Sequence, residues 1–538
     1  MTNNRLIFWL RWLVALTGLV AGAPGFAAAE PLDDALGALA SDDREQLESA
    51  LGALGSIDDP RALAALKALA DGTIRIAPPN HVFIQAEGRL VDAKTGTPAA
   101  ATPGSKELPV NNRLRRQLTI ALARAELRSR DTDVRLAAAE SLSRQPSIEL
   151  APDMRAALER EADTDIKDLL RVSLAGLDLA STDMDLQLAA LHAIDETATV
   201  SLIPEVRRLA RESATDTHPK VQALAADVLS ALERRVFWMS SAANLFYGAS
   251  LGSVLLLAAL GLAITFGLMR VINMAHGEML MLGAYSTFTV QNLVRQAAPS
   301  LFDWYLLLAI PTAFLVCALV GVFLERTVIR FLYGRPLETL LATWGISLAI
   351  IQTVRLIFGA QNVAVENPSW LSGGFELAPN IVLPYSRIAT ILFSVVVVGF
   401  VWALLQKTRL GMYVRAVTQN RDMAGNVGIP TRRIDVWTFA LGSGVAGLGG
   451  VALSQLGNVG PELGQGYIVD SFMVVVLGGV GNVAGTVAGA LGLGVANKFL
   501  EPLTGAVLGK IMLLGFLILF IQWRPQGIFA QKGRAAEL

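Results

Sequence analysis

The feature that most constrains this chain is a series of nearly uncharged runs between Val236 and Trp523, each long enough to cross a bilayer. A membrane-spanning helix needs about 20 predominantly apolar residues. We place such helices at 243–268, 278–294, 304–324, 338–357, 388–406, 436–456 and 507–523, with a glycine-rich apolar segment at 468–497. The sequence therefore predicts an all-α, polytopic membrane domain of about 7–8 transmembrane segments, one or two of them broken or re-entrant.

Composition divides the chain into two parts. The 538 residues are 53% hydrophobic and 17% charged, a balance too apolar for one soluble domain. Most of the charge precedes residue 236, so we expect a soluble domain at 30–235, a membrane domain at 236–530 and a cytoplasmic tail at 531–538. The net charge of -1 argues against a nucleic-acid partner. The single cysteine, Cys317, excludes an internal disulfide.

The first 29 residues have the order of a secretory signal peptide. Arg5 precedes a short apolar core, WLVALTGLVAG, and small residues follow at Ala27 to Ala29. Arg11 interrupts the core, and an uncleaved anchor is the alternative. Either interpretation places the following domain outside the cytoplasm.

Residues 30–235 have the rhythm of short amphipathic helices. In each unit Asp or His-Pro precedes an apolar stripe such as Val134, Ala138 and Leu142. The units are DDPRALAALKALADG (58–72), DTDVRLAAAESLSR (131–144), DTDIKDLLRVSLAGL (163–177) and HPKVQALAADVLSAL (218–232). This pattern predicts a periplasmic HEAT-like α-solenoid, with a plain helical bundle as the alternative.

An insert at 73–110 interrupts this rhythm. Alternating residues at Thr73 to Ile76 and Val82 to Leu90 predict a small β-hairpin, and the Pro, Gly and Thr residues that follow predict a flexible loop. The histidines of the soluble domain, His81, His192 and His218, are isolated in the sequence. We therefore expect no catalytic residue, metal or cofactor.

Loop charges orient the helices, because basic loops remain in the cytoplasm. Arg326, Arg330 and Arg335 mark one internal loop, whereas the loop after Phe358 is acidic and external. The basic C-terminal stretch WRPQGIFAQKGR is then internal only if segment 468–497 enters and leaves on one side. Its glycines favour such a broken path, and irregular backbone at that depth indicates a lining of the transport route.

A charged segment, Lys407 to Asp435, interrupts the apolar sequence, and we call it the charged island. It is basic and too long for a tight turn, so it predicts a short amphipathic element that presents a surface to a cytosolic partner. Its charges are Lys407, Arg409, Arg415, Arg421, Arg432 and Arg433 against Asp422 and Asp435.

A second polar interruption is MRVINMAHGEMLMLGAY, residues 269–285. Polar groups within a bilayer are costly unless they face a cavity or a partner. The segment is a capped cytoplasmic turn marked by Arg270, His276 and Glu278, or part of a substrate route, and both interpretations hold together if it is a broken helix. Glycine-interrupted segments in both halves of a transporter indicate its route. The route candidates are Asn273, His276, Glu278, Gly478, Gly479, Gly481 and Asn482, with Asn458 in an external loop.

Four ordered motifs resemble one family. INMAHGEMLMLGAY, NVGIPTRRIDVWTFALGSGVAGLGGVALSQ, GQGYIVDSFMVVVLGGVGN and FIQWRPQGIFA are similar to the permease subunit of the branched-chain amino-acid class of ABC importers. The similarity is closer to the urea-transport branch, in which an extended periplasmic region precedes the permease. It covers residues from about 240 to 530.

The resemblance implies partners: a second permease subunit, two cytoplasmic ATPases and a periplasmic substrate-binding protein. It also implies that Val414 to Asp435 docks the ATPase, with Gly428 as the characteristic glycine of that loop. The docking candidates are Arg415, Arg421, Asp422, Ala424, Gly428, Ile429 and Pro430. The chain has no GxxxxGK[ST] loop, so ATP hydrolysis falls to the partners and the chain is not itself an enzyme.

The expected function is import of a small, polar, uncharged solute, urea, by alternating access. Asn273, Asn458 and Asn482 offer the amide groups that urea would need. Two alternatives stay open. One is the same importer carrying branched-chain amino acids or short amides. The other is a passive channel or membrane receptor whose working part is the periplasmic solenoid, for which the charged island has no evident use.

Overall fold

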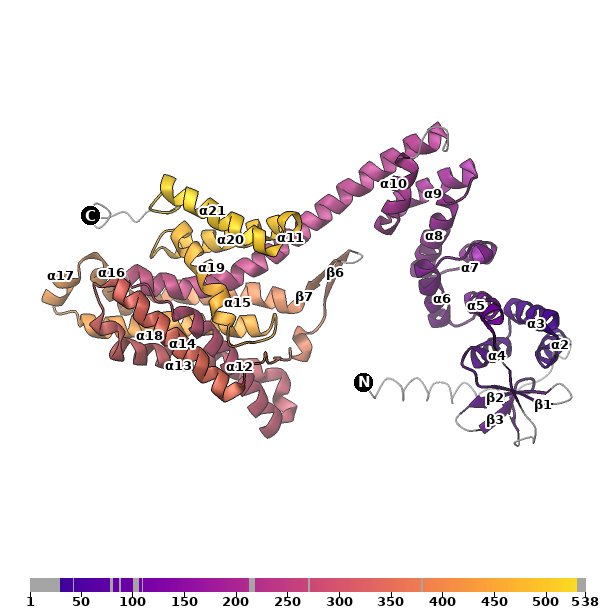
Figure 1. The fold of residues 1–538 in the computed structure, drawn as a ribbon, viewed down its shortest axis with the longest axis horizontal. Helices are drawn as coiled ribbons and strands as arrows, with labels where there is room; N and C mark the ends of the chain where they lie inside the picture. The colour runs from indigo at the N-terminus through magenta and orange to yellow at the C-terminus, as the bar shows by residue number, and fades with distance from the viewer. Residues whose placement is uncertain are drawn as a thin grey trace. The chain divides into compact units, whose positions relative to one another are not determined.

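A computed structural model describes residues 30–41, 43–77, 81–86, 89–99, 106–108, 110–211, 218–269, 271–378 and 381–529. The predicted signal peptide at 1–29 and tail at 531–538 lie outside these residues. The chain divides into two compact units, Met1–Val236 and Phe237–Leu538, which we describe separately (Figure 1).

Short helices make up most of the first unit. As predicted, Asp59, Asp131 and Asp163 each accept a hydrogen bond from a backbone N–H group in the first turn of their helix, which satisfies a donor that the helix itself leaves free. The helices are α2 Glu30–Ala38, α3 Arg44–Ser56, α4 Pro60–Ala70, α5 Asn112–Leu127, α6 Thr132–Arg144, α7 Ala151–Arg160, α8 Thr164–Leu179, α9 Met184–Thr197 and α10 Ile203–Arg211, with 3-10 turns η2 Ile148–Leu150 and η3 Val200–Leu202.

The core of this unit is a succession of apolar clusters along the chain. One cluster joins α2 to α5, a second joins α5 to α8, and a third joins α8 to the start of α11, Pro219–Met269. Leu174 belongs to the second cluster and its neighbour Ala175 to the third, so two different faces of α8 serve the two clusters. Each helix thus buries its stripe against its neighbours in sequence. The HEAT-like character of the domain stays a prediction.

The insert at 73–110 is larger than the predicted hairpin. It forms an antiparallel sheet with the strand order β4-β3-β2-β1-β5. The predicted pairing is that of β1 with β2, and Ile74 and Val82 from these strands reach the core of α2 to α5. An isolated hairpin is only marginally stable, and added strands supply the missing pairing. The strands are β1 Ile74–Ala77, β2 His81–Ala86, β3 Arg89–Asp92, β4 Pro98–Ala99 and β5 Lys106–Glu107.

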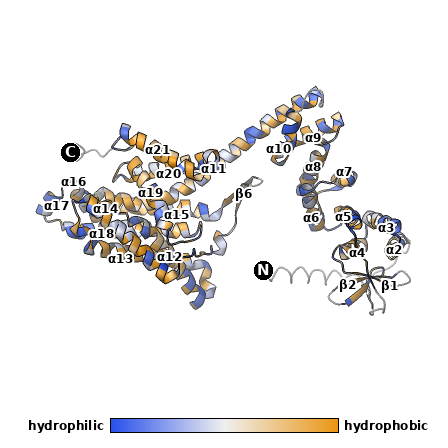
Figure 2. Cartoon of the chain, in the orientation of Figure 1, coloured by the Kyte–Doolittle hydropathy of each residue, from blue (hydrophilic) through white to orange (hydrophobic). Residues whose placement is uncertain are grey.

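The second unit contains a helix at every position that we placed in the membrane domain. Seven helical segments of the described chain are long and apolar enough to cross a membrane: those of α11, α13, α14, α15, α18, α20 and α21. Figure 2 colours each residue of the chain by its hydropathy. After α11 come α12 His276–Ala297, η4 Pro299–Trp304, α13 Tyr305–Thr327, η5 Ile329–Phe331, α14 Pro336–Phe358, α15 Tyr385–Lys407, α16 Arg409–Gln419, α17 Arg421–Asn426, α18 Thr431–Ser454, α19 Leu463–Gly478, α20 Val483–Thr504 and α21 Ala506–Trp523.

The glycine-rich segment at 468–497 is broken, as predicted. It consists of parts of α19 and α20, which meet at a turn where Gly479 and Gly481 have positive φ angles of 100° and 77°. Gly478 lies directly against Gly485 across this turn, with no space for a Cβ atom. Two helices that fold back on each other therefore replace a single span.

The loop after Phe358 has structure that the sequence-based prediction did not include. The long loop after Phe358 contains the 3-10 turn η6 Ser369–Leu371 and an antiparallel hairpin of β6 Gly374–Ala378 and β7 Ile381–Pro384. With the sheet of the first unit, this hairpin corrects the all-α assignment. The Oη of Tyr247 donates a hydrogen bond to the carbonyl of Val382, at 2.7 Å, and so attaches the hairpin to α11.

Candidate functional site

The N-terminal end of α12 lies deep within the second unit. The Nε2 atom of His276 is 3.0 Å from the carbonyl oxygen of Ala258. Ala258 lies about three turns, or roughly 16 Å, before the end of α11 at Met269. Residues 271–275 therefore run back along α11, and α12 begins beside a point about three turns before the end of its neighbour.

Polar contacts hold this segment in place. Asn273 accepts a hydrogen bond from the backbone N–H of Ala275 at 3.1 Å, and the N–H of Met274 donates to Thr343 of α14 at 3.1 Å. Ser347, one turn further along α14, donates to Glu278 at 2.8 Å. These contacts place Met274 and Glu278 against the same neighbouring helix.

The capped-turn alternative does not describe this segment. His276 and Glu278 are 0% and 1% exposed, and α12 has no side-chain cap at its start. Arg270, which shared that interpretation, lies outside the described residues. The two side chains are instead enclosed by protein, and their route-lining role stays a prediction.

Several buried polar atoms at this place lack a partner among the described residues. They are Nδ2 of Asn273, Nδ1 of His276, Oε2 of Glu278 and, two turns further along α12, the Oη of Tyr285. Each such atom costs about 1–3 kcal/mol when no hydrogen bond satisfies it. A cluster of them within one helix start therefore indicates a place where water or a polar ligand binds.

A second helix begins at the same place. An ideal Cβ atom on Gly277 would lie 2.6 Å from the carbonyl oxygen of Gly464, in the first turn of α19. Neither helix has a side-chain cap at its N-terminus. Free backbone N–H groups and the helix dipole give such ends a partial positive charge. Two N-terminal ends meeting inside the protein form the arrangement by which broken helices bind solutes in transporters.

The sequence-based analysis missed the contribution of α14. Thr339, Thr343 and Ser347 are buried, at 1%, 1% and 4% exposure, on a helix that otherwise exposes large side chains such as Leu337 and Leu341. The sequence does contain a pattern that indicates this contribution: a hydroxyl residue stands at every fourth position of an apolar helix, and residues four apart share one face.

The cluster lies near a more open, charged region. Arg355 of α14 pairs with Glu462, which precedes α19, at 2.5 Å. The Glu462 side chain is 70% exposed. An isolated β-bridge between Val363 and Val459 joins the two loops here. Asn458, the predicted external candidate, is an exposed residue of this region.

The candidates at the α19–α20 turn serve its local structure. Asn482 accepts a hydrogen bond from the N–H of Gly485 at 3.1 Å and so caps α20. Gly478 and Gly479 are covered by protein, the latter by the backbone of Phe529. Gly481 lies against Gly267 in the last turns of α11, just before the segment that holds Asn273. The α19–α20 turn and the segment that holds Asn273 thus both adjoin the end of α11. The role of this turn in a route stays a prediction.

The charged island folds into α16 and α17. Val414, Val417, Ala424 and Ile434 form a small apolar core that holds these helices against α18. Arg415 donates to the carbonyl of Leu405 and adds a polar attachment to α15. Figure 2 shows the hydrophilic colouring of this end of the unit.

Among the predicted docking residues, some face outward and others anchor the island. Two apolar residues next to the outward-facing candidates, Met423 and Val427, are 59% and 69% exposed. Gly428 has a φ of 88°, which favours glycine. The exposed candidates are Arg415, Asp422, Gly428 and Pro430, while Arg421 and Ile429 are half-buried and Ala424 is buried.

Partial burial opposes the charge of Arg421, but hydrogen bonding to Asp435 and the negative charge of that residue outweigh it and raise the pKa of the Arg421 guanidinium. Arg421 is therefore a charged residue held in one orientation rather than a free surface group.

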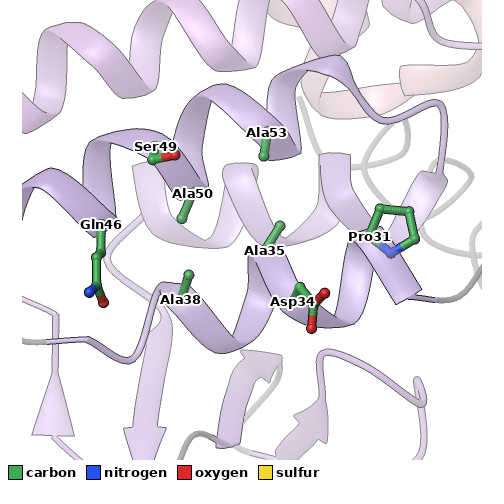
Figure 3. Close-up of a pocket in the computed structure, with 8 residues that line it drawn as sticks. All are labelled: Pro31, Asp34, Ala35, Ala38, Gln46, Ser49, Ala50 and Ala53. Atoms are coloured by element: carbon green, nitrogen blue, oxygen red, sulfur yellow. The ribbon is translucent and has the colours of Figure 1, made fainter.

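A shallow groove in the first unit lies between α2 and α3 (Figure 3). Small apolar side chains dominate its lining, and we assign it no function. The lining residues are Pro31, Asp34, Ala35, Ala38, Gln46, Ser49, Ala50 and Ala53.

Spanning helices, two helix starts that meet inside the protein and an outward-facing charged island together define a multi-pass membrane permease. The sequence pattern of the family "Branched-chain amino acid transport system / permease component" matches residues 244–521. The chain belongs to this family. Membership implies an ATPase and a substrate-binding protein as partners, and a membrane as the site of action.

Curated relatives agree with this assignment. The chain is 29% identical over 294 residues to the high-affinity branched-chain amino acid transport system permease protein BraD of Pseudomonas aeruginosa, covering 54% of this chain and 95% of the relative. It is 28% identical over 300 residues to LivH of Escherichia coli, with the same coverage. A shorter match, 35% over 109 residues, covers 19% of this chain and 34% of the ribose import permease protein RbsC of Escherichia coli. No solved structure matches the chain.

Proposed function

We propose that this chain is the permease subunit of an ATP-driven importer that carries urea across the inner membrane. The observation that carries the proposal is the unpartnered Oε2 of Glu278, buried beside two helix N-termini. The partners are a second permease subunit, two cytoplasmic ATPases and a periplasmic substrate-binding protein, and the N-terminal domain is periplasmic.

The chemistry of urea complements these groups. Urea has one carbonyl oxygen that accepts hydrogen bonds and two amino groups that donate them. The carboxylate of Glu278 accepts from an amino group, while Nδ2 of Asn273 is a donor suited to the carbonyl oxygen. Hydrogen bonds to a charged partner contribute about 1.5–3 kcal/mol each.

The charge balance of the site favours an uncharged solute. Among the described residues, no Lys or Arg forms an ion pair with Glu278, which accepts a hydrogen bond from Ser347. The nearest cation along α14, Arg355, lies about two turns beyond Ser347, or roughly 12 Å.

Branched-chain amino acids are the second candidate, and the names of the curated relatives favour them. Their ammonium group suits Glu278, and their carboxylate suits the two helix N-termini. The two candidates therefore share one site and differ in whether a carboxylate binds there.

Uptake of labelled urea and labelled leucine in a transport-deficient strain separates the candidates. Wild-type chain, expressed with its partner subunits, is expected to restore urea uptake, and Glu278→Gln to reduce its apparent affinity by about 10-fold or more. Glu338→Gln is the matched control, because its carboxylate is exposed and pairs with Arg335 on the surface. Leucine uptake without urea uptake would establish the amino-acid candidate instead.

Transport by alternating access requires that ATP-driven closure of the ATPases acts on α16 and α17 and moves the helices that begin at the site. Met423→Asp and Val427→Asp place charges on the exposed apolar surface and are expected to remove the copurifying ATPase. A chain lacking residues 409–433 that still transports would support the passive channel.

Sidedness is testable with a single thiol. Cys317 is buried, so the native chain gives little background labelling. Asp422→Cys places a thiol on the exposed part of the island, and membrane-impermeant reagents should label it only in inverted vesicles. Labelling from outside intact cells would contradict the proposed orientation.

A further inference from the structure

A polar contact joins the charged island to the bundle beneath it. Both terminal nitrogens of Arg421, the first residue of α17, donate to the carboxylate of Asp435 in α18. The side chain of Asp435 is only 4% exposed, whereas that of Arg421 is 41% exposed. A buried carboxylate is costly without such a partner, so Asp435 fixes the position of the start of α17.

The same guanidinium stacks on Tyr333. Its central carbon lies 4.9 Å from the ring centroid of Tyr333, which follows η5 in the turn between α13 and α14. The hydroxyl of Tyr333 points to the sulfur of Met269, at an Oη–Sδ distance of 3.9 Å. The buried carboxyl of Glu325 adds an electrostatic interaction with Tyr333.

Met269 is the last residue of α11, immediately before the segment that returns to the candidate site. Tyr333 and Met269 also share one apolar cluster with Val271, on that segment, and Met279, in the first turn of α12. Packed side chains of this kind do not compress but change between discrete arrangements. A displacement of α17 therefore reaches the end of α11 through Arg421 and Tyr333.

We propose that Arg421, Asp435 and Tyr333 form a mechanical relay between the ATPase-docking helix and the broken helix that begins the substrate site. The proposal rests on the proposed function. The three are positioning residues: none is proposed to touch the solute. Arginine is the residue suited to this place, because its planar fork binds a carboxylate with two nitrogens while its face stacks on an aromatic ring. Lysine has one nitrogen and no planar face, so it cannot make both contacts in this geometry.

A stabilising contact and a relay differ in one observable quantity. A purely stabilising contact affects the amount of folded complex and leaves the number of solute molecules imported per ATP unchanged. A relay affects that ratio in complexes that are fully assembled, because ATP hydrolysis continues while the site no longer follows it.

The experiment uses the full complex in proteoliposomes, with the substrate-binding protein and the ATPases that copurify with the wild-type chain. Imported solute and hydrolysed ATP are measured together, with urea or leucine according to what the wild type carries. The variants are Arg421→Lys, Asp435→Asn, Tyr333→Leu and Tyr333→Phe. Arg335→Lys is the matched control, since Arg335 is exposed, pairs with Glu338 on the surface and lies outside the proposed docking segment.

We expect Arg421→Lys and Tyr333→Leu to retain the ATPase and its hydrolysis while the import per ATP falls about 5-fold or more. Tyr333→Phe, which keeps the ring and loses the hydroxyl, should lie between these variants and the wild type, and Arg335→Lys should match the wild type. Asp435→Asn gives a second test at the same contact should Arg421→Lys fail to assemble.

Two results would overturn the relay. One is an import-to-ATP ratio equal to wild type in assembled Arg421→Lys and Tyr333→Leu complexes. The other is loss of the ATPase from both variants, which would make these residues part of the docking surface. A wild-type chain that retains no ATPase at all would instead overturn the proposed function itself.

Discussion

The contact between Gly277 and Gly464 allows a prediction whose size follows from the structure. In Gly277→Ala, the new Cβ atom would lie 2.6 Å from the carbonyl oxygen of Gly464, 3.0 Å from its carbonyl carbon and 3.2 Å from Cβ of Ile468. Carbon–oxygen contacts usually begin near 3.3 Å. The starts of α12 and α19 must therefore separate by roughly 0.7 Å or more.

This separation has two consequences. Overpacking of this kind costs about 1–3 kcal/mol of stability. The larger effect concerns transport, because a displacement of about 1 Å in groups that hold a solute reduces rates by as much as 100-fold. We therefore expect a modest loss of stability and a loss of uptake of at least about 10-fold.

Thermal unfolding in detergent and solute uptake in proteoliposomes measure the two effects. Gly345→Ala is the matched control, because nothing lies within 4 Å of the added Cβ atom on this helical glycine of α14. It should be neutral or slightly stabilising, by up to about 1 kcal/mol. Equal stability and equal uptake in Gly277→Ala and Gly345→Ala would refute the close contact of the two helix starts.

Two further predictions concern stability. The hydrogen bond from Arg135 lowers the pKa of Glu161 from 4.5 to about 2; because the pKa is lower in the folded state, this stabilisation is complete above about pH 4.5 and is lost as the pH falls towards 2. The unfolding temperature of Glu161→Gln should therefore lie below that of the wild type at pH 7 and converge with it in acid. Glu140→Gln, at an exposed pair, should change the unfolding temperature little at either pH. In Tyr305→Phe, the carbonyl of Glu366 and the amide of Gln455 lose their hydrogen bonds to the buried Tyr305 hydroxyl. The free energy of unfolding should fall by about 1–3 kcal/mol in the same assay. Tyr385→Phe, at an exposed tyrosine, should leave it unchanged.

The helices of the membrane domain could be predicted from the sequence because lipid leaves the backbone few alternatives. Backbone groups in hydrocarbon must bond within their own segment, so an apolar run of sufficient length becomes a helix. The run predicted at 388–406 is helical from Tyr385 to Lys407. Glycine likewise indicated the turn between α19 and α20, since Gly479 and Gly481 adopt backbone angles that other residues disfavour.

The geometry of the candidate site could not be predicted in the same way. Asn273, His276 and Glu278 were identifiable as polar residues in an apolar setting, but their depth depends on the contact of His276 with Ala258 and of Gly277 with Gly464. The latter pair is distant in sequence, and no local pattern joins its members. The β6–β7 hairpin escaped prediction for a related reason, because its short strands depend on pairing with each other and on the contact of Tyr247 with Val382.

The directions of α12 and α19 give Glu278 a further constraint. The end of α12 packs near Tyr305 through Val290 and Val294, whereas the end of α19 packs near Gly527 and Phe529. The two helices therefore leave their meeting point in opposite directions, and both positive ends remain there.

A carboxylate beside two positive helix ends has two separable roles, compensation of the helix charge or binding of a solute. Compensation predicts that Glu278→Gln destabilises the solute-free protein by about 1–2 kcal/mol. Binding of the proposed solute, urea, predicts nearly unchanged stability without it, stabilisation of the wild type by urea, and loss of that stabilisation in Glu278→Gln. The structure favours binding, because the recorded hydrogen bond to Glu278 comes from Ser347 of α14, and among the described residues no backbone N–H of α12 or α19 is its donor. Unfolding curves of wild type and Glu278→Gln, with and without urea at non-denaturing concentrations, decide between them, and a large loss of stability without urea would establish compensation instead.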